Sequence, residues 1–253
     1  MTGSHRDTVR SSFRNQVGLF TGEDSPFAST GNPNLTWLGP LSGDVIALEV
    51  ACVAAHVAEE LAPHVRTVVG VDLTPELLTL GGARLRSANV TNVVLQEGDA
   101  EHLPFLDESF GLVYCRASLH HFADPRAAVH EMARVCRAGG HVALSDLVVA
   151  DRDVRDTFDA VHRLLDPSHT RALTGDELVA LVPAELDASP AAPGSVRFPI
   201  DAVITEQSDR EGVYEILGAE IDGGRRTGLE PAWEDGALTV AFATRALQAV
   251  KPA

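Results

Sequence analysis

The sequence contains little cysteine and no long hydrophobic run. Its three cysteines, Cys52, Cys115 and Cys136, are scattered and form no C-x-x-C pair, so neither a disulfide framework nor a zinc knuckle is indicated. The first ten residues are polar, and no uninterrupted apolar stretch approaches the roughly 20 residues that span a bilayer. These absences predict a protein of a reduced, cytoplasmic compartment without a membrane-spanning segment.

Basic residues are also scarce. Asp and Glu outnumber Lys and Arg by 36 to 20, which gives a formal net charge of −16 at pH 7. A surface this acidic repels phosphate backbones and anionic lipids. We therefore expect a small-molecule substrate and neither a nucleic-acid nor a membrane partner, although a local basic patch stays open as an alternative and the chain could form a homodimer.

From residue 45 onward, short apolar runs alternate with segments of helical periodicity. Continuously apolar runs are typical of strands buried on both faces of a sheet, and the helices between them imply right-handed parallel crossovers. We therefore predict an α/β fold with a Rossmann-like, doubly wound, mostly parallel sheet of seven strands. The expected strands are residues 45–50, 67–71, 92–96, 111–115 and 141–147, with a turn at 137–140 and a C-terminal antiparallel pair at 195–201 and 238–249; the expected helices are 54–61, 74–87 and 124–135.

Two flanking segments complete the expected organisation. Residues 8–20 have the spacing of a short amphipathic helix, and the loop at 22–40 holds Phe27 and Trp37, which would either anchor it to the core or wall a pocket. After residue 150 we expect helices at 151–165 and 174–181 and a linker at 184–194. The predicted parts are thus 1–43, an N-terminal helix and lid; 44–150, a cofactor-binding core; and 151–253, substrate-covering helices and the strand pair of the same domain.

Acidic residues stand where the first three strands end. Glu49 closes the first strand and Asp72 the second, 23 residues later, and an acid at this spacing can accept hydrogen bonds from ribose hydroxyls. A strand-ending aspartate can instead cap the next helix, but Thr74 occupies that capping position, which leaves Asp72 available. Asp99 follows the third strand, where a carboxylate could accept from an exocyclic amine.

Four motifs in this order resemble class I S-adenosylmethionine-dependent methyltransferases, in particular the branch that acts on quinones and small molecules. They are VVGVDLTPELL, EGDAEHLPF, HHFADP and RVCRAGG, within a likeness that covers residues 44–147. The resemblance implies methyl transfer from S-adenosylmethionine to a small organic acceptor. It places the cofactor's amino group near Glu49, its methionyl part over the backbone of 51–55, its ribose at Asp72, its adenine beside Leu73, Asp99 and Ala100, and its sulfonium side between Cys115 and Arg116.

One motif departs from the family it resembles. The family builds its first turn from glycines, or from alanine and glycines, whereas this chain has Ala51, Val53 and Ala55. Glycine reaches positive φ freely, but a β-branched residue does so only as an outlier. Val53 is therefore expected to add strain or a clash of about 1–3 kcal/mol. Two alternatives stay open: a methyltransferase-fold enzyme that catalyses a cyclisation or an elimination, and a non-catalytic pseudo-enzyme.

Histidines follow the fourth strand, at the sheet edge where ligands of α/β proteins bind. His120 or His121 could act as a general base for an acceptor hydroxyl or phenol, or could simply hold the loop backbone. A metal site of His120, His121 and Asp124 is less favoured, because adjacent histidines in an extended stretch point apart, and we expect no metal. His169 lies in a polar break between two helices. Cys115 is not expected to be a nucleophile, because nothing nearby would lower its pKa.

Overall fold

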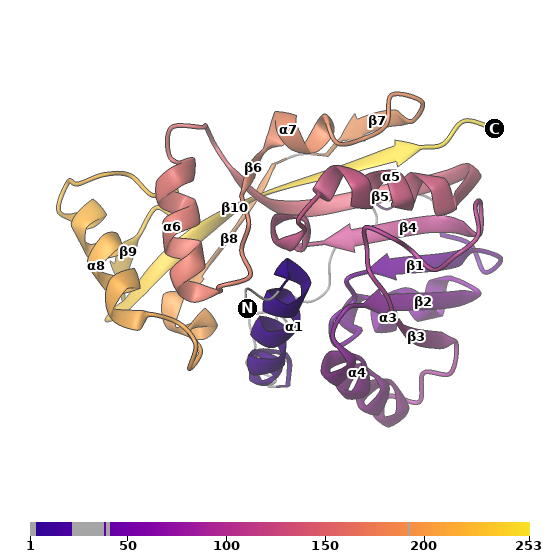
Figure 1. The fold of residues 1–253 in the computed structure, drawn as a ribbon, viewed down its shortest axis with the longest axis horizontal. Coiled ribbons are helices and arrows are strands. Elements are labelled where there is room, and N and C mark those ends of the chain that lie inside the picture. The colour runs from indigo at the N-terminus through magenta and orange to yellow at the C-terminus, as the bar shows by residue number, and fades with distance from the viewer. Residues whose placement is uncertain (1–3, 22–37, 39–40, 192) are drawn as a thin grey trace.

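The computed structural model describes residues 4–21, 38, 41–191 and 193–253 (Figure 1). Phe27 and Trp37 lie outside these residues. Five parallel strands form the centre of the sheet, in the order β3-β2-β1-β4-β5. Their bounds are β1 Ile46–Val50, β2 Thr67–Asp72, β3 Val93–Glu97, β4 Phe110–Arg116 and β5 Cys136–Val149. The strand order reverses between β1 and β4, which is where ligands bind in open α/β sheets.

Antiparallel strands extend this sheet beyond β5. The long strand β10 (Ala237–Val250) pairs with β5 and then with β7 (Asp187–Pro190), so the central path contains seven strands. The strands β8 (Gly194–Pro199) and β9 (Ala232–Glu234) pair with β10, and β6 (Leu173–Thr174) pairs with β5. The predicted Rossmann-like class with a C-terminal antiparallel addition is therefore confirmed.

Helices between the parallel strands follow the predicted order. They are α3 (His56–Leu61), the 3₁₀ turn η3 (Ala62–His64), α4 (Pro75–Ser87), the 3₁₀ turn η4 (Leu119–His121) and α5 (Pro125–Val135). The strands β1 and β4 are buried along nearly their whole length, as their apolar runs predict. Their side chains contribute to the main core, which includes Leu48 of β1, Val113 of β4 and Leu144 of β5.

A second lobe follows β5. It contains α6 (Arg155–Leu165), the 3₁₀ turn η5 (Ile200–Val203) and α8 (Arg210–Ile221), whereas α7 (Gly175–Val179) packs on the main core through Leu178. Its separate hydrophobic cluster includes Phe158 of α6, Leu217 of α8 and Phe242 of β10. The strand β10 runs from this lobe into the central sheet, so one strand joins the two parts (Figure 1).

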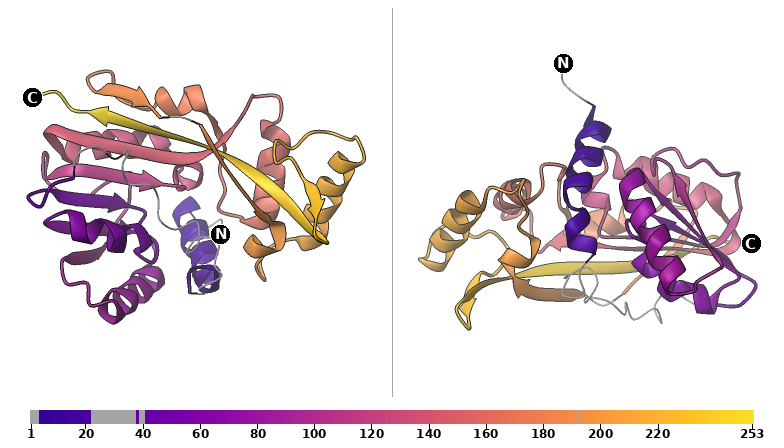
Figure 2. Two further views of the ribbon diagram at one scale, coloured as in Figure 1. Left: turned by 180° about the vertical axis from the view of Figure 1, so that it is seen from behind. Right: turned by 90° about the horizontal axis from the view of Figure 1, so that it is seen from below.

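The N-terminal helix stands between the two parts. Helix α1 (His5–Asn15) begins with a capping box between Ser4 and Asp7, and η1 (Val17–Phe20) follows it. Figure 2 shows α1 between the central sheet and the C-terminal lobe. Phe20 is buried with Ala54 and Leu77, so the apolar face of this segment packs on the loop after β1.

Three local predictions were wrong. The predicted turn at 137–140 is an irregularity within β5: Phe110 pairs with Cys136 and Leu112 with His141, so the extra residues bulge out of a continuous strand. The predicted linker at 184–194 contains β7. The stretch between the last two predicted strands contains α8 and β9, which were not predicted.

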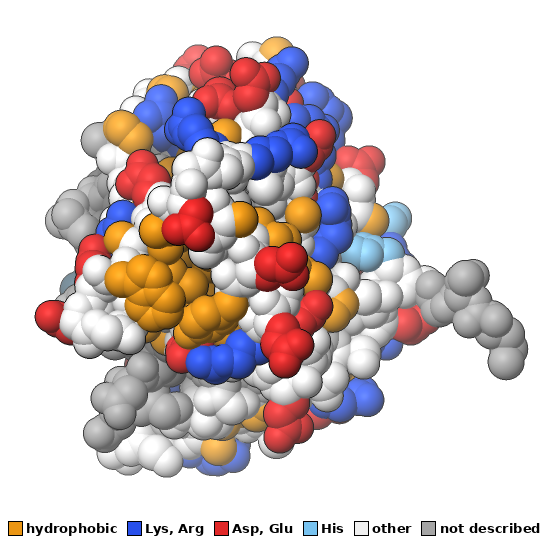
Figure 3. Space-filling view, turned by 90° about the vertical axis from the view of Figure 1, so that its left-hand side faces the viewer, with side chains coloured by type: hydrophobic (Ala, Val, Ile, Leu, Met, Phe, Trp, Pro, Cys, Tyr) orange, Lys and Arg blue, Asp and Glu red, His pale blue; other side chains and the backbone are white. Residues whose placement is uncertain are grey.

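The outer face of the C-terminal lobe carries exposed apolar side chains. Trp233 of β9 is 59% exposed and lies beside Tyr214 of α8, and hydrophobic side chains gather in one patch when the molecule is viewed from this end (Figure 3). Within the described residues, no helix combines the length and apolarity needed to cross a membrane.

Candidate functional site: a nucleotide-type cradle beside a histidine-lined cavity

The loop between β1 and α3 has the positive φ angles that are typical of a glycine-rich turn, but it contains no glycine. Ala51, Val53 and Ala55 have φ values of 56°, 50° and 60°, all in the left-handed region that favours glycine. The sequence therefore indicated correctly where this loop needs positive φ. Val53, a β-branched residue at φ 50°, is the most strained of the three, because its branched side chain crowds the backbone there.

Backbone hydrogen bonds to Asp72 hold this loop in place. Its Oδ2 atom accepts the Val53 N–H at 2.9 Å, and its Oδ1 atom accepts the Thr74 N–H at 2.8 Å. Burial raises the pKa of Asp72, and the two amides oppose that rise. The prediction that Thr74 caps α4 through its side chain was wrong, since Thr74 makes no such hydrogen bond and the Asp72 carboxylate takes its amide instead. Asp72 thus has a structural role as well as lying at the predicted ribose position.

A buried carboxylate lies at the end of β1. The Glu49 residue is 5% exposed, and its Oε2 atom has no hydrogen-bond partner within the described part of the chain. Burial raises the pKa of Glu49 to about 8, while the positive charge of Arg116 opposes the rise. A cationic group placed beside Glu49 would supply the partner that this oxygen lacks.

This carboxylate makes the stability of the free protein depend on pH. The folded-state pKa of Glu49 lies above its ordinary value, so folding binds a proton and stability falls as pH rises from about 4.5 to 8. We expect Glu49→Gln, which cannot ionise, to exceed the parent in stability by about 2 kcal/mol at pH 6. Calorimetric melting curves at pH 4 and pH 6 test this: the two proteins should converge at pH 4, and a constant difference would contradict the assignment.

A small hollow occupies the position predicted for adenine. Leu73, Asp99 and Ala100 line it, and its volume is about 70 Å³. Helix α1 lies over it: Arg6 forms an ion pair with Asp99, and the Arg10 Nε atom donates to the Leu73 carbonyl at 3.1 Å. Because small-molecule pockets usually measure about 300–1,000 Å³, an adenine ring requires α1 to shift outward.

A larger cavity of about 430 Å³ lies between the carboxyl edge of the sheet and the C-terminal lobe. Its lining is mainly apolar, with a few polar groups. Phe13 and Phe20 contribute from the N-terminal segment, and His162 and Leu165 contribute from α6. The two flanking segments thus border an apolar pocket at the predicted edge. Val53 lines both this cavity and the smaller hollow, so its side chain forms part of the wall between them.

The two residues at the end of β4 have different surroundings. Arg116 lines the cavity, whereas Cys115 is fully buried in the core. Burial raises the pKa of the Cys115 thiol well above its ordinary value, which agrees with the expectation that it is no nucleophile.

The predicted histidines both lie in η4. The His120 Nδ1 atom lies 2.5 Å from Asp146 Oδ1, and the His121 Nδ1 atom lies 2.9 Å from Ser168 Oγ. Burial, together with the neighbouring His120, lowers the pKa of His121 to about 4. The expectation that the two rings point apart was wrong: in the 3₁₀ turn their centroids are 4.2 Å apart. Asp124 caps α5 by accepting the Ala127 N–H, which takes it away from these histidines.

Sequence reasoning missed two polar residues at this site. Asp146 lies within the apolar strand β5 and is 2% exposed, and a buried acid in such a run was an available signal. His162 lies on the buried side of α6, where its ring stacks on that of His169 at 4.2 Å with an interplanar angle of 2°. His169 in turn places its Nε2 atom 2.7 Å from Asp159 Oδ1. Three imidazoles thus meet beside the cavity.

The fold and the site together define a class. A doubly wound sheet with acids closing β1 and β2, and a left-handed loop between β1 and α3, forms a cradle of the kind that binds nucleotide-type cofactors. Residues 48–144 match the family model described as a methyltransferase domain. With the relatives below, this match supports the assignment of this domain to the class I methyltransferase superfamily.

Known proteins are similar to parts or most of this chain. The uncharacterized methyltransferase YcgJ of Bacillus subtilis is 38% identical over 138 residues, which are 54% of each chain. The chain spans about half the length of the curated relatives it matches. Among solved structures, a putative methyltransferase from Bacillus halodurans is similar, with a TM-score of 0.77, 27% identity and coverage of 92% of this chain and 100% of the other.

A more distant structure shares the fold alone. Phosphoethanolamine N-methyltransferase 2 of Haemonchus contortus, solved in complex with S-adenosylmethionine, has a TM-score of 0.67 at 17% identity. The likeness covers 100% of this chain and 61% of the other.

Proposed function

We propose that this protein transfers a methyl group from S-adenosylmethionine to a small organic acceptor held in the larger cavity. One observation carries the proposal: the cavity is walled on one side by the cofactor-type loop, through Glu49 and Val53, and on another by His120. A donor on the loop and an acceptor in the cavity would therefore lie next to each other. The strongly acidic charge of the chain supports a small-molecule acceptor over a nucleic acid.

The residues present fit the charge pattern of this cofactor. The unpartnered Glu49 oxygen suits an ammonium group, and the Asp72 carboxylate lies where ribose hydroxyls would be recognised. Two features narrow the space available to S-adenosylmethionine: the Val53 side chain and the α1 residues above the smaller hollow. We infer that binding occurs with reduced affinity and with displacement of α1.

The protein's part in the reaction is mainly alignment. S-adenosylmethionine supplies an already activated methyl group, so proximity and in-line orientation account for most of the catalysis. The apolar part of the cavity lining would limit the contact of the reacting groups with water. The Asp146 carboxylate fixes the His120 ring with Nδ1–H toward itself, which leaves the Nε2 lone pair to meet a polar group of the acceptor.

Two measurements test the function. Titration calorimetry should show binding of S-adenosylmethionine, and a panel of phenols, quinols and small alcohols should include an acceptor that drives release of S-adenosylhomocysteine. No binding, together with an organic ligand retained in the cavity, would favour the non-methylating cyclisation or elimination. Binding of neither would favour the pseudo-enzyme.

Replacing Asp72 tests the ribose position. We expect Asp72→Ala to weaken cofactor binding by about 1–3 kcal/mol, since buried hydroxyls would lose a charged acceptor. The variant should also be less stable, because the amides of Val53 and Thr74 lose their partner. Asp72→Asn is the milder control, since its side-chain oxygen can still accept one amide. Unchanged calorimetric affinity in both variants would exclude Asp72 from the ribose role.

A further inference from the structure

Two carboxylates fix the tautomers of two histidines beside the cavity. Asp146 accepts from Nδ1 of His120, and Asp159 accepts from Nε2 of His169. A neutral imidazole that donates from one nitrogen carries a lone pair on the other. His120 therefore presents its Nε2 lone pair, and His169 presents its Nδ1 lone pair.

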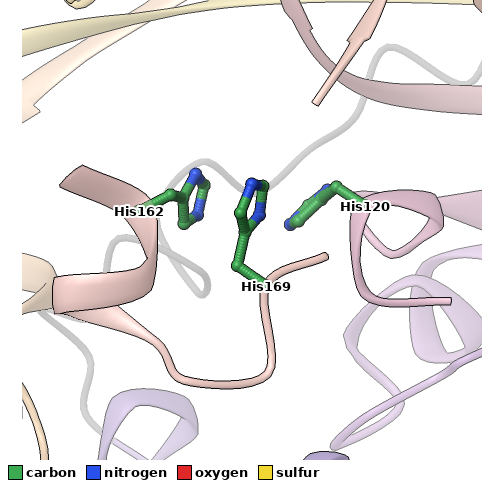
Figure 4. Close-up of side chains that lie close together, drawn as sticks. All are labelled: His120, His162 and His169. Carbon is green, nitrogen blue, oxygen red and sulfur yellow. The ribbon is translucent and has the colours of Figure 1, made fainter. Parts of the chain in front are cut away.

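A third imidazole lies close to these two histidines. Figure 4 shows His162, His169 and His120 side by side. One ligand nitrogen from each of the three rings lies within 4.8 Å of the others. The Nδ1 atoms of His162 and His169 are buried, and neither has a hydrogen-bond partner among the described residues. Three neutral imidazoles carry three N–H groups and three lone pairs. Two of the N–H groups donate to Asp146 and Asp159, so the remaining one cannot satisfy all three lone pairs.

We propose that His120, His162 and His169 bind one divalent transition-metal ion, of which Zn²⁺ is the best match, with an open coordination position facing the cavity. Three imidazoles with a free fourth position are a donor set that suits catalytic Zn²⁺. A carboxylate on the far nitrogen of a ligating histidine orients the ring and strengthens it as a ligand, and two of the three have one. The carboxylates are themselves held, since Asp146 accepts the Leu119 N–H and Asp159 accepts the Ala172 N–H.

The pKa values of two histidines in the cluster are lowered. Burial and the neighbouring imidazoles lower the pKa of His169 to about 2, and the same causes lower the pKa of His162 well below its ordinary value. His162 and His169 thus favour the neutral form, which is the form of imidazole that binds metals.

Coordination requires the rings to turn slightly. Ligand nitrogens around a tetrahedral Zn²⁺ ion lie about 3.4 Å apart, given metal–nitrogen distances near 2.05 Å. His162 and His169 are stacked with parallel planes, so their in-plane lone pairs do not yet point at one spot. Rotation of the His162 side chain on α6 brings the nitrogens together, and it would draw α6 toward η4.

The metal would define the acceptor class. A divalent cation lowers the pKa of an oxygen that it binds, so a hydroxyl or phenol at the open position would lose its proton more easily and become a better methyl acceptor. This consequence rests on the proposed methyl transfer, but metal binding itself does not depend on it.

The test uses Co²⁺ and Zn²⁺ with the full chain. Titration with Co²⁺ should give the visible absorption of a four-coordinate site, and Zn²⁺ should bind with 1:1 stoichiometry in competition with a chromophoric chelator. Zn²⁺ should also raise the melting temperature, because it links α6 to the central sheet. His162→Ala should weaken Zn²⁺ binding at least 100-fold, and Asp159→Asn should weaken it about 10–100-fold. His130→Ala, an exposed position on α5, is the matched control and should bind as the parent does.

The outcomes separate this proposal from the proposed function. No absorption with Co²⁺ and no Zn²⁺ binding by the parent would overturn the metal site, as would Zn²⁺ binding that survives His162→Ala unchanged. If His162→Ala does not fold, His162→Gln and Asp159→Asn replace it in the same comparison. Calorimetry with S-adenosylmethionine, run on the same samples, tests cofactor binding separately. Metal binding without cofactor binding would contradict the proposed methyl transfer but support the metal site.

Discussion

Val53→Gly is expected to raise the affinity for S-adenosylmethionine by up to about 150-fold. Val53 has a φ of 50° in a loop where the family uses glycine, and its side chain lines both hollows that the cofactor would bridge. Removal of the side chain relieves the strained backbone and opens the wall between these hollows. Titration calorimetry on parent and variant measures the gain directly.

The free variant should change little in stability, because opposing effects meet at this position. Relief of strain at positive φ stabilises the folded loop. Two effects act in the opposite direction: glycine gives the unfolded chain more conformational freedom, which costs about 0.5–1 kcal/mol of stability, and the contact of the Val53 side chain beside Phe20 is lost. Ala51→Gly is the matched control, with a similar φ but only a methyl group to remove, and it should bind only slightly tighter than the parent. If Val53→Gly binds no tighter, Val53 is not the obstruction.

The second large effect is expected at His120. His120→Asn should lower turnover by about 10²–10⁴-fold, because it removes the Nε2 atom that faces the acceptor. The asparagine amide can still donate to Asp146 from near the position of Nδ1, so the buried carboxylate keeps a partner. The loss follows whether Nε2 accepts a proton or holds a metal ion.

Initial rates of S-adenosylhomocysteine release, with an acceptor identified from the panel, measure this loss. Affinity for S-adenosylmethionine should stay within about twofold of the parent, since His120 lies on the acceptor side. His130→Ala serves again as the control, with parent-like turnover. A rate for His120→Asn equal to that of the control would exclude His120 from the reaction.

The sequence predicted the central sheet because its parallel strands contain short apolar runs, which are largely buried in β1, β2 and β4 although the edge strand β3 is partly exposed. It also predicted the left-handed turn, since a motif constrains the backbone even where its glycines are replaced. It failed where local patterns were ambiguous. The bulge around Gly139 looks like a turn, because a glycine pair can serve either purpose. The Pro-rich stretch around β7 looks like a linker, because proline is allowed on edge strands.

The site was only partly predictable for a different reason. Glu49, Asp72 and His120 follow strands that meet at one edge, so topology alone brings them together. His162 and Asp159 belong to α6, whose position against η4 depends on tertiary packing of the lobe. A histidine on the apolar side of an amphipathic helix most often fills core space, so its sequence position alone gave no reason to pair it with His120.

Helix α1 has a kinetic consequence. Its residues line both the hollow beside Asp99 and the larger cavity. Release of a cofactor from the first and of a product from the second would therefore both require α1 to move. Half-exposed arginines fasten this helix to the core, among them Arg10 to Glu97 and Arg14 to Glu76. Exposed pairs of this kind contribute at most about 1 kcal/mol each and are screened by salt. The rate of product release should therefore increase with ionic strength. If product release is the slow step of the catalytic cycle, the rate at which α1 moves away from the core would set turnover.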